Sequence, residues 1–330
     1  MKICIYGAGA VGILLGAGLA RAGNDVSVVA RGETLVAIQQ NGLGLQTPDG
    51  IEYCPATASA DPAALGPQDL IIIAVKQPAL DAVSRSLAPL MAAHTQVLLA
   101  MNGVPWWFFD GLSGEYQGMT LKRVDPDGQL RQRIPSAQVL GCVVHLACST
   151  PQPGVSFNPF GKRLIIGRPR GNTEAVDTAV RERLQAARFE VEWSARIQQD
   201  IWYKLWGNMT MNPVSALTKA TSDKVLDDEL VNAFCSRAME EAAMIGDLIG
   251  CPIDETPQAR NAVTRKLGAM RTSMLQDADA GKTLEVEALI GVVHEMGVRT
   301  GVATPSISAL YGLIRLYASQ MGQSSVPAAG

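Results

Sequence analysis

The first residues of the chain carry the feature that most restricts its fold, a set of closely spaced glycines behind an apolar segment. Residues 3–6 form a short apolar run, Gly7, Gly9 and Gly12 follow it, and an apolar stretch of helical character begins directly behind them. A strand, a turn with the spacing G-x-G-x-x-G and a helix form the phosphate-binding turn of a Rossmann fold. The sequence therefore predicts that a dinucleotide binds here. The alternative is a glycine-rich turn in some other α/β fold.

The glycines of this turn, GAGAVG, have separate expected tasks. Gly7 allows a tight turn, Gly9 lets the backbone approach the pyrophosphate, and Gly12 lets the helix pack closely on the strand. The free N–H groups and the positive end of the helix dipole then face the phosphates. The predicted cofactor-binding turn comprises Gly7, Ala8, Gly9, Ala10, Val11 and Gly12.

The residue behind the second predicted strand bears on the choice of cofactor. This strand covers residues 26–30, and Arg31 follows it where an NAD enzyme usually carries an acid for the ribose hydroxyls. A guanidinium can bind a 2′-phosphate through two parallel hydrogen bonds. Arg31 therefore favours NADP(H) over NAD(H). The alternative is an ordinary solvated arginine, and Glu33 lies nearby.

The remaining pattern predicts two domains. Apolar runs alternate with helical stretches in the first part, as in a parallel sheet covered on both faces, and the expected strands are 3–6, 26–30, 70–75, 97–101, 139–147, 164–167 and 189–193. Helical spacing then dominates, over 196–217, 228–249, 256–276, 284–296 and 306–318. We expect an α/β Rossmann domain with a mostly parallel, doubly wound sheet over residues 1–194 and an all-α domain over 195–330.

A long segment between two predicted strands, residues 103–138, contains the aromatic run Trp106 to Phe109. Loops of this length are often functional. One interpretation is a cover over a substrate site. The other is that the aromatic side chains pack on their own domain or at a subunit contact.

Composition limits the partners and the location. The net charge of −3 gives no basic footprint for nucleic acid. The 6 cysteines are scattered and only 3 histidines accompany them, so we expect no metal site and reduced thiols in a cytoplasmic protein. The uncharged window over residues 3–20 is diluted by glycines and followed by a strand pattern, so neither a signal peptide nor a membrane span is expected.

The helix predicted over residues 196–217 carries Lys204, Asn208 and Asn212 four residues apart, which places them on roughly one face. Trp202 and Trp206 beside Lys204 can partly desolvate its ammonium and ease the release of a proton. A lysine in such surroundings can protonate a carbonyl oxygen while hydride reaches the carbon. A lysine that extends its ammonium to solvent, in a helix kinked at residues 212–213, gives the same pattern.

Short motifs along the chain occur in an order that is hard to obtain by chance. They are GAGAVG at 7–12, AVK at 74–76, NG at 102–103, K-x-x-x-N-x-x-x-N-P at 204–213, SMLQD at 273–277 and L-E-V-E at 284–287. Through them the sequence resembles the ketopantoate reductase family over nearly its whole length. The resemblance implies NADPH-dependent reduction of 2-dehydropantoate to (R)-pantoate, a step toward coenzyme A. It also implies a helical domain like the C-terminal domain of 6-phosphogluconate dehydrogenase, and a possible homodimer.

The resemblance implies roles for individual residues. Lys204 would be the general acid toward the ketone oxygen, and Glu285 the acidic partner near the substrate hydroxyl. Lys76 would lie near the ribose and the nicotinamide, and Asn102 would bridge cofactor and substrate. The implied substrate-binding residues are Asn102, Asn208, Asn212 and Ser273. As alternatives, Glu285 is a solvated helix residue with Glu287 as its competitor, and Ser273 is a helix-surface serine.

Some positions depart from the family pattern. Ile290 replaces an asparagine, and Val143 with Val144 replaces threonines before the histidine of the fifth strand. These changes predict a more apolar pocket and raise the alternative of a bulkier, more apolar 2-oxo acid as substrate. A third hypothesis is a redox sensor that binds NADP(H) without turnover. Lys204 and Glu285 argue against it, because a sensor needs no proton donor.

Overall fold

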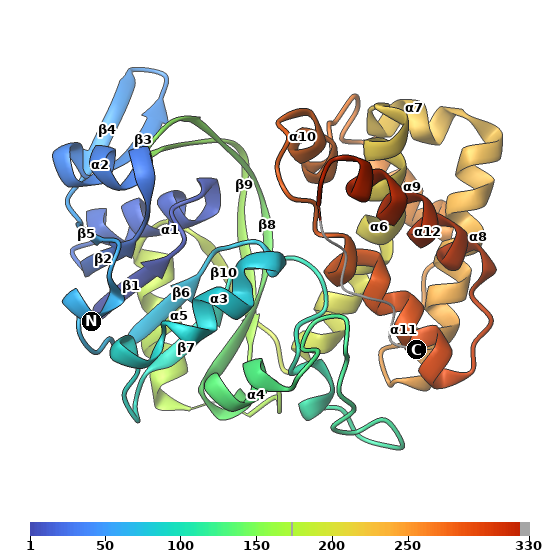
Figure 1. Ribbon diagram of the computed structural model, residues 1–330, viewed down its shortest axis with the longest axis horizontal. Helices are drawn as coiled ribbons and strands as arrows, with labels where there is room; N and C mark the ends of the chain where they lie inside the picture. Colours follow the sequence, from blue (N-terminus) through green and yellow to red (C-terminus); the bar gives the residue numbers. More distant parts are fainter. Residues whose placement is uncertain (173, 324–330) are drawn as a thin grey trace. The chain divides into compact units, whose positions relative to one another are not determined.

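Residues 1–172 and 174–323 are described by a computed structural model. The chain divides into two compact units, one of Met1–Met101 with Gln129–Ile197 and one of Asn102–Gly128 with Gln198–Gly330. The first unit holds the sheet and the second holds the long helices (Figure 1). The predicted combination of an α/β and an all-α part is confirmed. Residues 102–128 belong to the helical unit in this division. The boundary expected between residues 194 and 195 would assign them to the sheet domain.

The sheet unit contains one 10-stranded sheet. Its strands are β1 (Lys2–Tyr6), β2 (Asp25–Val29), β3 (Leu43–Thr47), β4 (Gly50–Cys54), β5 (Thr57–Ser59), β6 (Leu70–Ile73), β7 (Gln96–Leu99), β8 (Val139–Gln152), β9 (Val155–Gly167) and β10 (Glu190–Trp193). The order is β4-β3-β9-β8-β7-β6-β1-β2-β5, with β10 beside β9. Among the strands of the described residues, only the pairs β3–β4 and β8–β9 are antiparallel. The sheet is therefore mostly parallel, as predicted.

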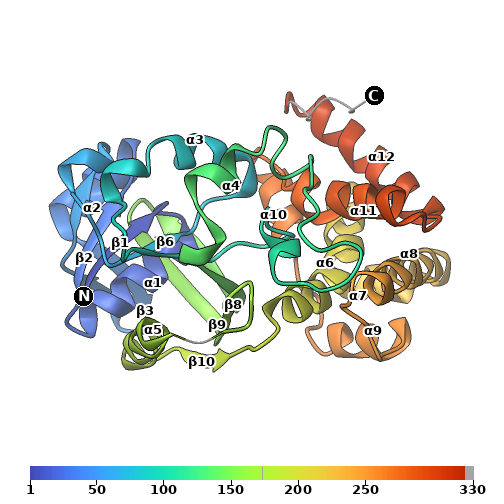
Figure 2. The same ribbon diagram turned by 90° about the horizontal axis from the view of Figure 1, so that it is seen from below.

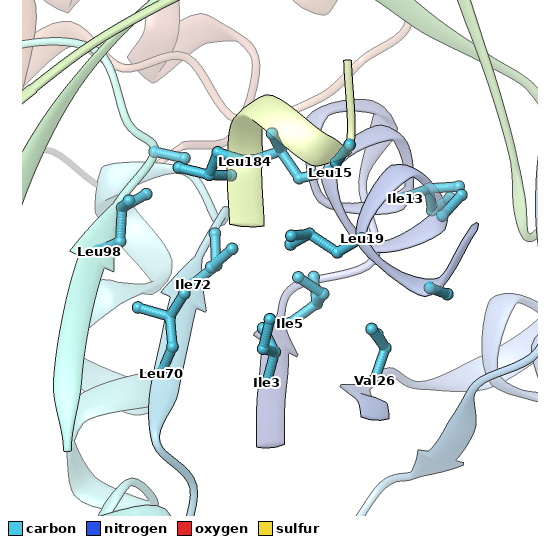
Figure 3. Close-up of a cluster of buried hydrophobic side chains, with 14 of the residues drawn as sticks. Ile3, Ile5, Ile13, Leu15, Leu19, Val26, Leu70, Ile72, Leu98 and Leu184 are labelled. Atoms are coloured by element: carbon cyan, nitrogen blue, oxygen red, sulfur yellow. The ribbon is translucent and has the colours of Figure 1, made fainter. Parts of the chain in front are cut away.

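Strand β1 stands at the switch point of this sheet, because β2 pairs with one of its edges and β6 with the other, both parallel to it. Helices α1 (Ala10–Arg21) and α5 (Ala175–Ala186) cover one face, and α3 (Leu80–Arg85) and α4 (Gln129–Arg133) lie on the other (Figure 2). Figure 3 shows the apolar side chains of the central strands pointing toward those of α1 and α5. The remaining helix is α2 (Gly32–Asn41), and the short 3-10 turns are η1 (Pro62–Ala64), η2 (Gln77–Ala79), η3 (Ala88–Leu90) and η5 (Ser136–Gln138).

The helical unit follows β10 in the chain. Its helices are α6 (Ile197–Thr218), α7 (Ser222–Asp227), α8 (Glu229–Leu248), α9 (Pro257–Arg265), α10 (Ser273–Asp279), the π-helical turn η6 (Glu287–Gly291), α11 (Val292–Thr300) and α12 (Pro305–Gln320). Pro213 lies inside α6, and the helix continues beyond it. Among the described residues, no helix is both long enough and apolar enough to cross a membrane.

The helix predicted over residues 256–276 is wrong as a single element. Gly268 has a φ of +64° between α9 and α10, a conformation that ends a helix readily at glycine and at few other residues. The Ser222 hydroxyl donates to the Gly268 carbonyl at 2.8 Å and holds this break. The hydroxyl of Thr272 then caps α10 by accepting from the backbone N–H of Leu275 at 3.2 Å. Ser273 is therefore the first residue of a short separate helix.

The aromatic run of the long segment is part of the interior of the helical unit. The exposed fractions of Trp106, Trp107, Phe108 and Phe109 are 2%, 1%, 0% and 0%, and Phe108 and Phe109 belong to the short turn η4 (Phe108–Asp110). The ring centroids of Phe108 and Trp202 on α6 are 6.3 Å apart. The aromatic side chains thus pack rather than cover a site. These side chains pack in the helical unit, although the segment that carries them follows strand β7 of the sheet unit in the chain.

A buried ion pair joins the end of β9 to α5. The Nε and Nη2 atoms of Arg168 donate to the two carboxylate oxygens of Asp177 at 2.8 Å each. Arg168 also donates to the side chain of Gln96 and to the carbonyl of Ala137, both at 2.9 Å. The side chains of Arg168 and Asp177 are 3% and 0% exposed, so solvent does not screen the pair.

We expect Asp177→Ala to lower the free energy of unfolding of the sheet unit by about 3–5 kcal/mol, because it removes the buried carboxylate that pairs with the buried guanidinium. The half-exposed carboxylate of Glu174, 3.3 Å from Nη2 of Arg168, then remains as its counter-charge. Urea unfolding followed by circular dichroism measures this. The control is Glu192→Ala, which removes an exposed pair with Arg163 whose side chains are 49% and 55% exposed. That loss should stay below about 1 kcal/mol. Equal losses of unfolding free energy in the two variants would show that the buried ion pair contributes no more than the exposed one.

Candidate active site

The glycine-rich turn between β1 and α1 has the backbone geometry that its spacing predicts. Gly7 has a φ of +108°, which favours glycine. A Cβ at Gly12 would lie 2.0 Å from the carbonyl oxygen of Gly7, so α1 can pack this closely on the strand only without a side chain there. A Cβ at Gly9 would meet nothing within 4 Å. The backbone of Gly9 is therefore open to the approach of another molecule.

The start of α1 is suited to an anion. Gly9 is its N-cap, and within the described residues no side chain caps the helix and no acid stands in its first turn. The first N–H groups of a helix lack partners in the helix itself and carry the positive end of its dipole. Together with the open space at Gly9, this fits the pyrophosphate of a dinucleotide. Direct contact by Gly7, Ala8, Gly9, Ala10, Val11 and Gly12 stays a prediction.

Arg31 and Lys76 lie at the same edge of the sheet as this turn. Arg31 follows β2 and is the N-cap of α2, and Lys76 follows β6 and is the N-cap of η2. Since β2 and β6 flank β1 in parallel, their carboxyl ends lie on either side of the end of β1. Arg31 is exposed and Lys76 is half-buried. In the described part of the chain, no hydrogen bond or ion pair engages the Arg31 side chain.

Lys204 and Asn102 meet inside the helical unit. Lys204 lies on α6, and its ammonium donates to Oδ1 of Asn102 at 2.8 Å. Asn102 is the first residue of that unit and comes shortly after β7 in the chain. Both side chains are half-buried. The structure thus brings together two residues that were predicted separately, one for proton transfer and one for bridging cofactor and substrate.

The indoles beside Lys204 point into the interior of the unit. Trp202 and Trp206 are each 1% exposed, and Nε1 of Trp206 donates to the carbonyl of Met239 on α8 at 2.6 Å. Lys204 itself is half-buried, so α6 buries the two indoles more deeply than the lysine between them. A half-buried lysine can reach a substrate and exchange its proton with water afterwards.

The remaining predicted residues are spread over the same unit. Asn208 and Asn212 continue the face of α6 that carries Lys204, half-buried and 5% exposed respectively. Ser273 is exposed at the start of α10, and Glu285 is half-buried just before η6. Among the described residues, no hydrogen bond engages the side chains of Asn208, Asn212 or Ser273. Their amide and hydroxyl groups remain available to a ligand.

The three positions that depart from the family pattern are all buried. Val144 belongs to the hydrophobic core of the sheet unit, in one cluster with Ile5 and Leu15. Val143 is 3% exposed and Ile290, within η6, is 1% exposed. The expectation that these residues make the substrate pocket more apolar stays a prediction.

Glu287, expected only as a competitor of Glu285, has partners that the sequence does not indicate. Glu287 is 8% exposed and accepts from the hydroxyl of Tyr311 through both carboxylate oxygens, at 3.1 and 2.9 Å. The one sequence feature that pointed to Glu287 was its place two residues after Glu285. The partners could not be predicted, since Tyr311 lies on α12.

A phosphate-binding turn at the switch point of a Rossmann sheet, followed by a helical unit with Lys204 beside Asn102, defines the class of two-unit oxidoreductases that use a nicotinamide dinucleotide. The family models described as ketopantoate reductase PanE/ApbA and its C-terminal domain match residues 3–171 and 196–318, and the chain belongs to this family.

Individual relatives agree with the family models. A 2-dehydropantoate 2-reductase from Mesorhizobium japonicum is 39% identical over 98% of this chain and 99% of its own length. A crystal structure described as a ketopantoate reductase from Ralstonia solanacearum is 52% identical, with a TM-score of 0.93 over 98% of this chain and 99% of that one. A 2-dehydropantoate 2-reductase from Halobacterium salinarum is 26% identical over 96% and 98%. The predicted family, enzyme class and type of cofactor are confirmed. The homodimer and the individual site residues stay predictions.

Proposed function

We propose that this protein reduces 2-dehydropantoate to (R)-pantoate with NADPH, and that Lys204 supplies the proton. The observation that carries the proposal is the 2.8 Å hydrogen bond from Lys204 to Asn102 in a chain of this family. The name of the Mesorhizobium japonicum relative supports the substrate, and the exposed Arg31 supports NADPH.

We assign a separate role in the reduction to each of the predicted site residues. When bound, the reduced nicotinamide supplies a hydride to the 2-carbonyl carbon. Lys204 donates its proton to the carbonyl oxygen, where negative charge develops. Asn102 holds the ammonium of Lys204 in place through its Oδ1 atom. Asn208, Asn212 and Ser273 offer donors to the carboxylate and hydroxyl groups of the substrate, and Glu285 accepts from the substrate hydroxyl.

The proposed substrate is tested by comparing turnover of 2-dehydropantoate with that of 2-oxo acids with larger apolar side chains. We expect the highest kcat/KM for 2-dehydropantoate, because hydrogen-bonding groups dominate the predicted substrate residues. A preference for a larger apolar 2-oxo acid would keep the cofactor and the role of Lys204 but reject 2-dehydropantoate as the substrate.

The proposed cofactor preference depends on Arg31. We expect Arg31→Ala to raise the Kd of NADPH by about tenfold or more and to leave the Kd of NADH within about twofold, because a charge-assisted bond to the 2′-phosphate contributes about 1.5–3 kcal/mol. Fluorescence titration of both dinucleotides measures this. A control is Arg85→Ala, which removes an exposed arginine paired with Asp81. Equal losses for NADPH and NADH in Arg31→Ala would show that Arg31 does not read the 2′-phosphate.

A further inference from the structure

Residues 102–128, which we call the strap, are fastened to the helical unit near both ends. At the start, the backbone N–H of Val104 donates to the carbonyl of Ala288 at 3.1 Å. Gly103 has a φ of +85°, and a Cβ there would lie 2.5 Å from the same carbonyl oxygen. Near the other end, the backbone N–H groups of Lys122 and Arg123 both donate to the Glu295 carboxylate at 2.8 Å.

The first fastening point belongs to the π-helical turn η6, which contains Ala288. A π turn is rare and often lies at a functional site. Here it follows Glu285, the proposed acidic partner of the substrate, after a single intervening residue. The strap residue ahead of Gly103 is Asn102, which accepts from Lys204. The contact between strap and turn thus stands one residue from Asn102.

Glu287 connects this turn to the far part of the strap. Besides the Tyr311 hydroxyl, its Oε2 atom faces Nη1 of Arg123 at 3.5 Å. The Arg123 guanidinium also lies 5.6 Å from the centroid of the Tyr311 ring. The side chains of Arg123 and Glu287 are 12% and 10% exposed. One buried carboxylate therefore links η6, the strap and α12.

The burial of the Glu287 carboxylate against η6 is energetically unfavourable. Burial raises the pKa of Glu287 above its ordinary value, and the Tyr311 hydrogen bond and the charges of Arg123 and Arg315 oppose this only in part, while Glu295 adds to the rise. Because the folded pKa is raised, the stability that the group contributes is full below its unfolded pKa and is lost as pH rises through the folded pKa. Loss of the Glu287 proton therefore lowers the free energy of unfolding, so the stability of the fold alone does not account for a carboxyl group at this position.

We propose that Glu287 is a positioning residue, which holds the strap on η6 through Arg123 and Tyr311 and thereby keeps Asn102 against Lys204. The inference rests on the proposed function of Lys204 and Asn102. Glu287 itself acts through the strap and needs no contact with cofactor or substrate. A small displacement of a positioning group is enough to slow an enzyme, since about 1 Å can change the rate by about a hundredfold.

The test is Glu287→Gln, which keeps the size of the side chain and an acceptor for Tyr311 but removes the charge facing Arg123. We expect kcat to fall at least about tenfold, the melting temperature not to fall, and the Kd of NADPH to stay within about twofold. The matched control is Glu241→Gln, another buried carboxylate, which accepts from the backbone N–H groups of Ser306 and Ile307 at 2.9 Å each. It should lower the melting temperature and leave kcat unchanged. A Glu287→Gln variant that loses kcat only in proportion to lost folded protein would overturn the proposal.

Two further readouts separate this inference from the proposed function. Hydrogen exchange of the Val104 amide should be at least about tenfold faster in Glu287→Gln, whether or not the protein turns over any substrate. If the wild-type protein reduces no 2-oxo acid, the proposed function fails, and the exchange rate still decides the inference. Unchanged exchange at Val104 would overturn it. With turnover present, kcat of the wild-type protein should decline as pH falls through the raised pKa of Glu287, and Glu287→Gln should lack this decline.

Discussion

Replacement of Lys204 by alanine is expected to lower kcat by about 10²–10⁴-fold, because proton transfer from a positioned side chain contributes about that factor. The Kd of NADPH should stay within about twofold, since the predicted dinucleotide residues are mostly in the sheet unit. Lys204 is half-buried and its ammonium donates to the Asn102 amide oxygen, so we expect the fold to survive the change. Steady-state kinetics, with a melting curve for each variant, measure the effect.

The control for Lys204 is Lys219→Ala. Lys219 follows the same helix, and its ammonium pairs with Asp279 at 2.8 Å with 46% of the side chain exposed. Like Lys204→Ala, this variant removes one lysine and one of its hydrogen bonds from the helical unit. It should keep kcat within about twofold. Near-normal turnover of Lys204→Ala, with an unchanged KM for the 2-oxo acid, would show that another group supplies the proton.

Alanine at Gly12 and alanine at Gly9 are expected to have different effects, although the glycines share one turn. At Gly12 the new methyl would lie 2.0 Å from the Gly7 carbonyl oxygen, so α1 has to move away from β1. We expect a loss of about 1–3 kcal/mol in the free energy of unfolding. NADPH binding should weaken at least about tenfold, because the displaced helix no longer presents its N–H groups correctly.

At Gly9 the methyl would enter open space, and the φ of −80° is accessible to alanine. The free energy of unfolding should therefore change by less than about 0.5 kcal/mol. NADPH binding should still weaken about tenfold, because the methyl stands where the pyrophosphate approaches the backbone. Urea unfolding and fluorescence titration separate the two effects. If Gly9→Ala loses as much stability as Gly12→Ala, or binds NADPH like the wild-type protein, the assigned roles are wrong.

The central strands and long helices could be predicted because their own residues carry the signal. Strand β6 is a continuous apolar run, and β1 and β7 are apolar after their first residues, Lys2 and Gln96, since the sheet buries these strands on both faces. The hairpin of β3 and β4 was missed because most of β4 is exposed and lacks such a run. Strands β8 and β9 extend beyond their predicted ends for the same reason, as their distal residues pair with each other in partly exposed positions.

The catalytic helix could be predicted for a similar reason, because Lys204, Asn208 and Asn212 share one helix and their spacing alone places them on one face. The position of the strap could not be predicted from the sequence. Its contacts join Val104 to Ala288 and Arg123 to Glu287, which are distant in sequence and belong to no repeating pattern. The aromatic run of the strap shows only that it will be buried, and either unit could have buried it.

The most direct test of the proposed function is a single turnover with NADPH that carries deuterium at the transferred position of the nicotinamide. The purified protein is mixed with this cofactor and 2-dehydropantoate, and the product is analysed by mass spectrometry and NMR. We expect the wild-type protein to form pantoate with deuterium at C2, and Lys204→Ala to form it much more slowly. Cofactor that stays reduced in the presence of the wild-type protein, or pantoate without deuterium at C2, would contradict the proposed function.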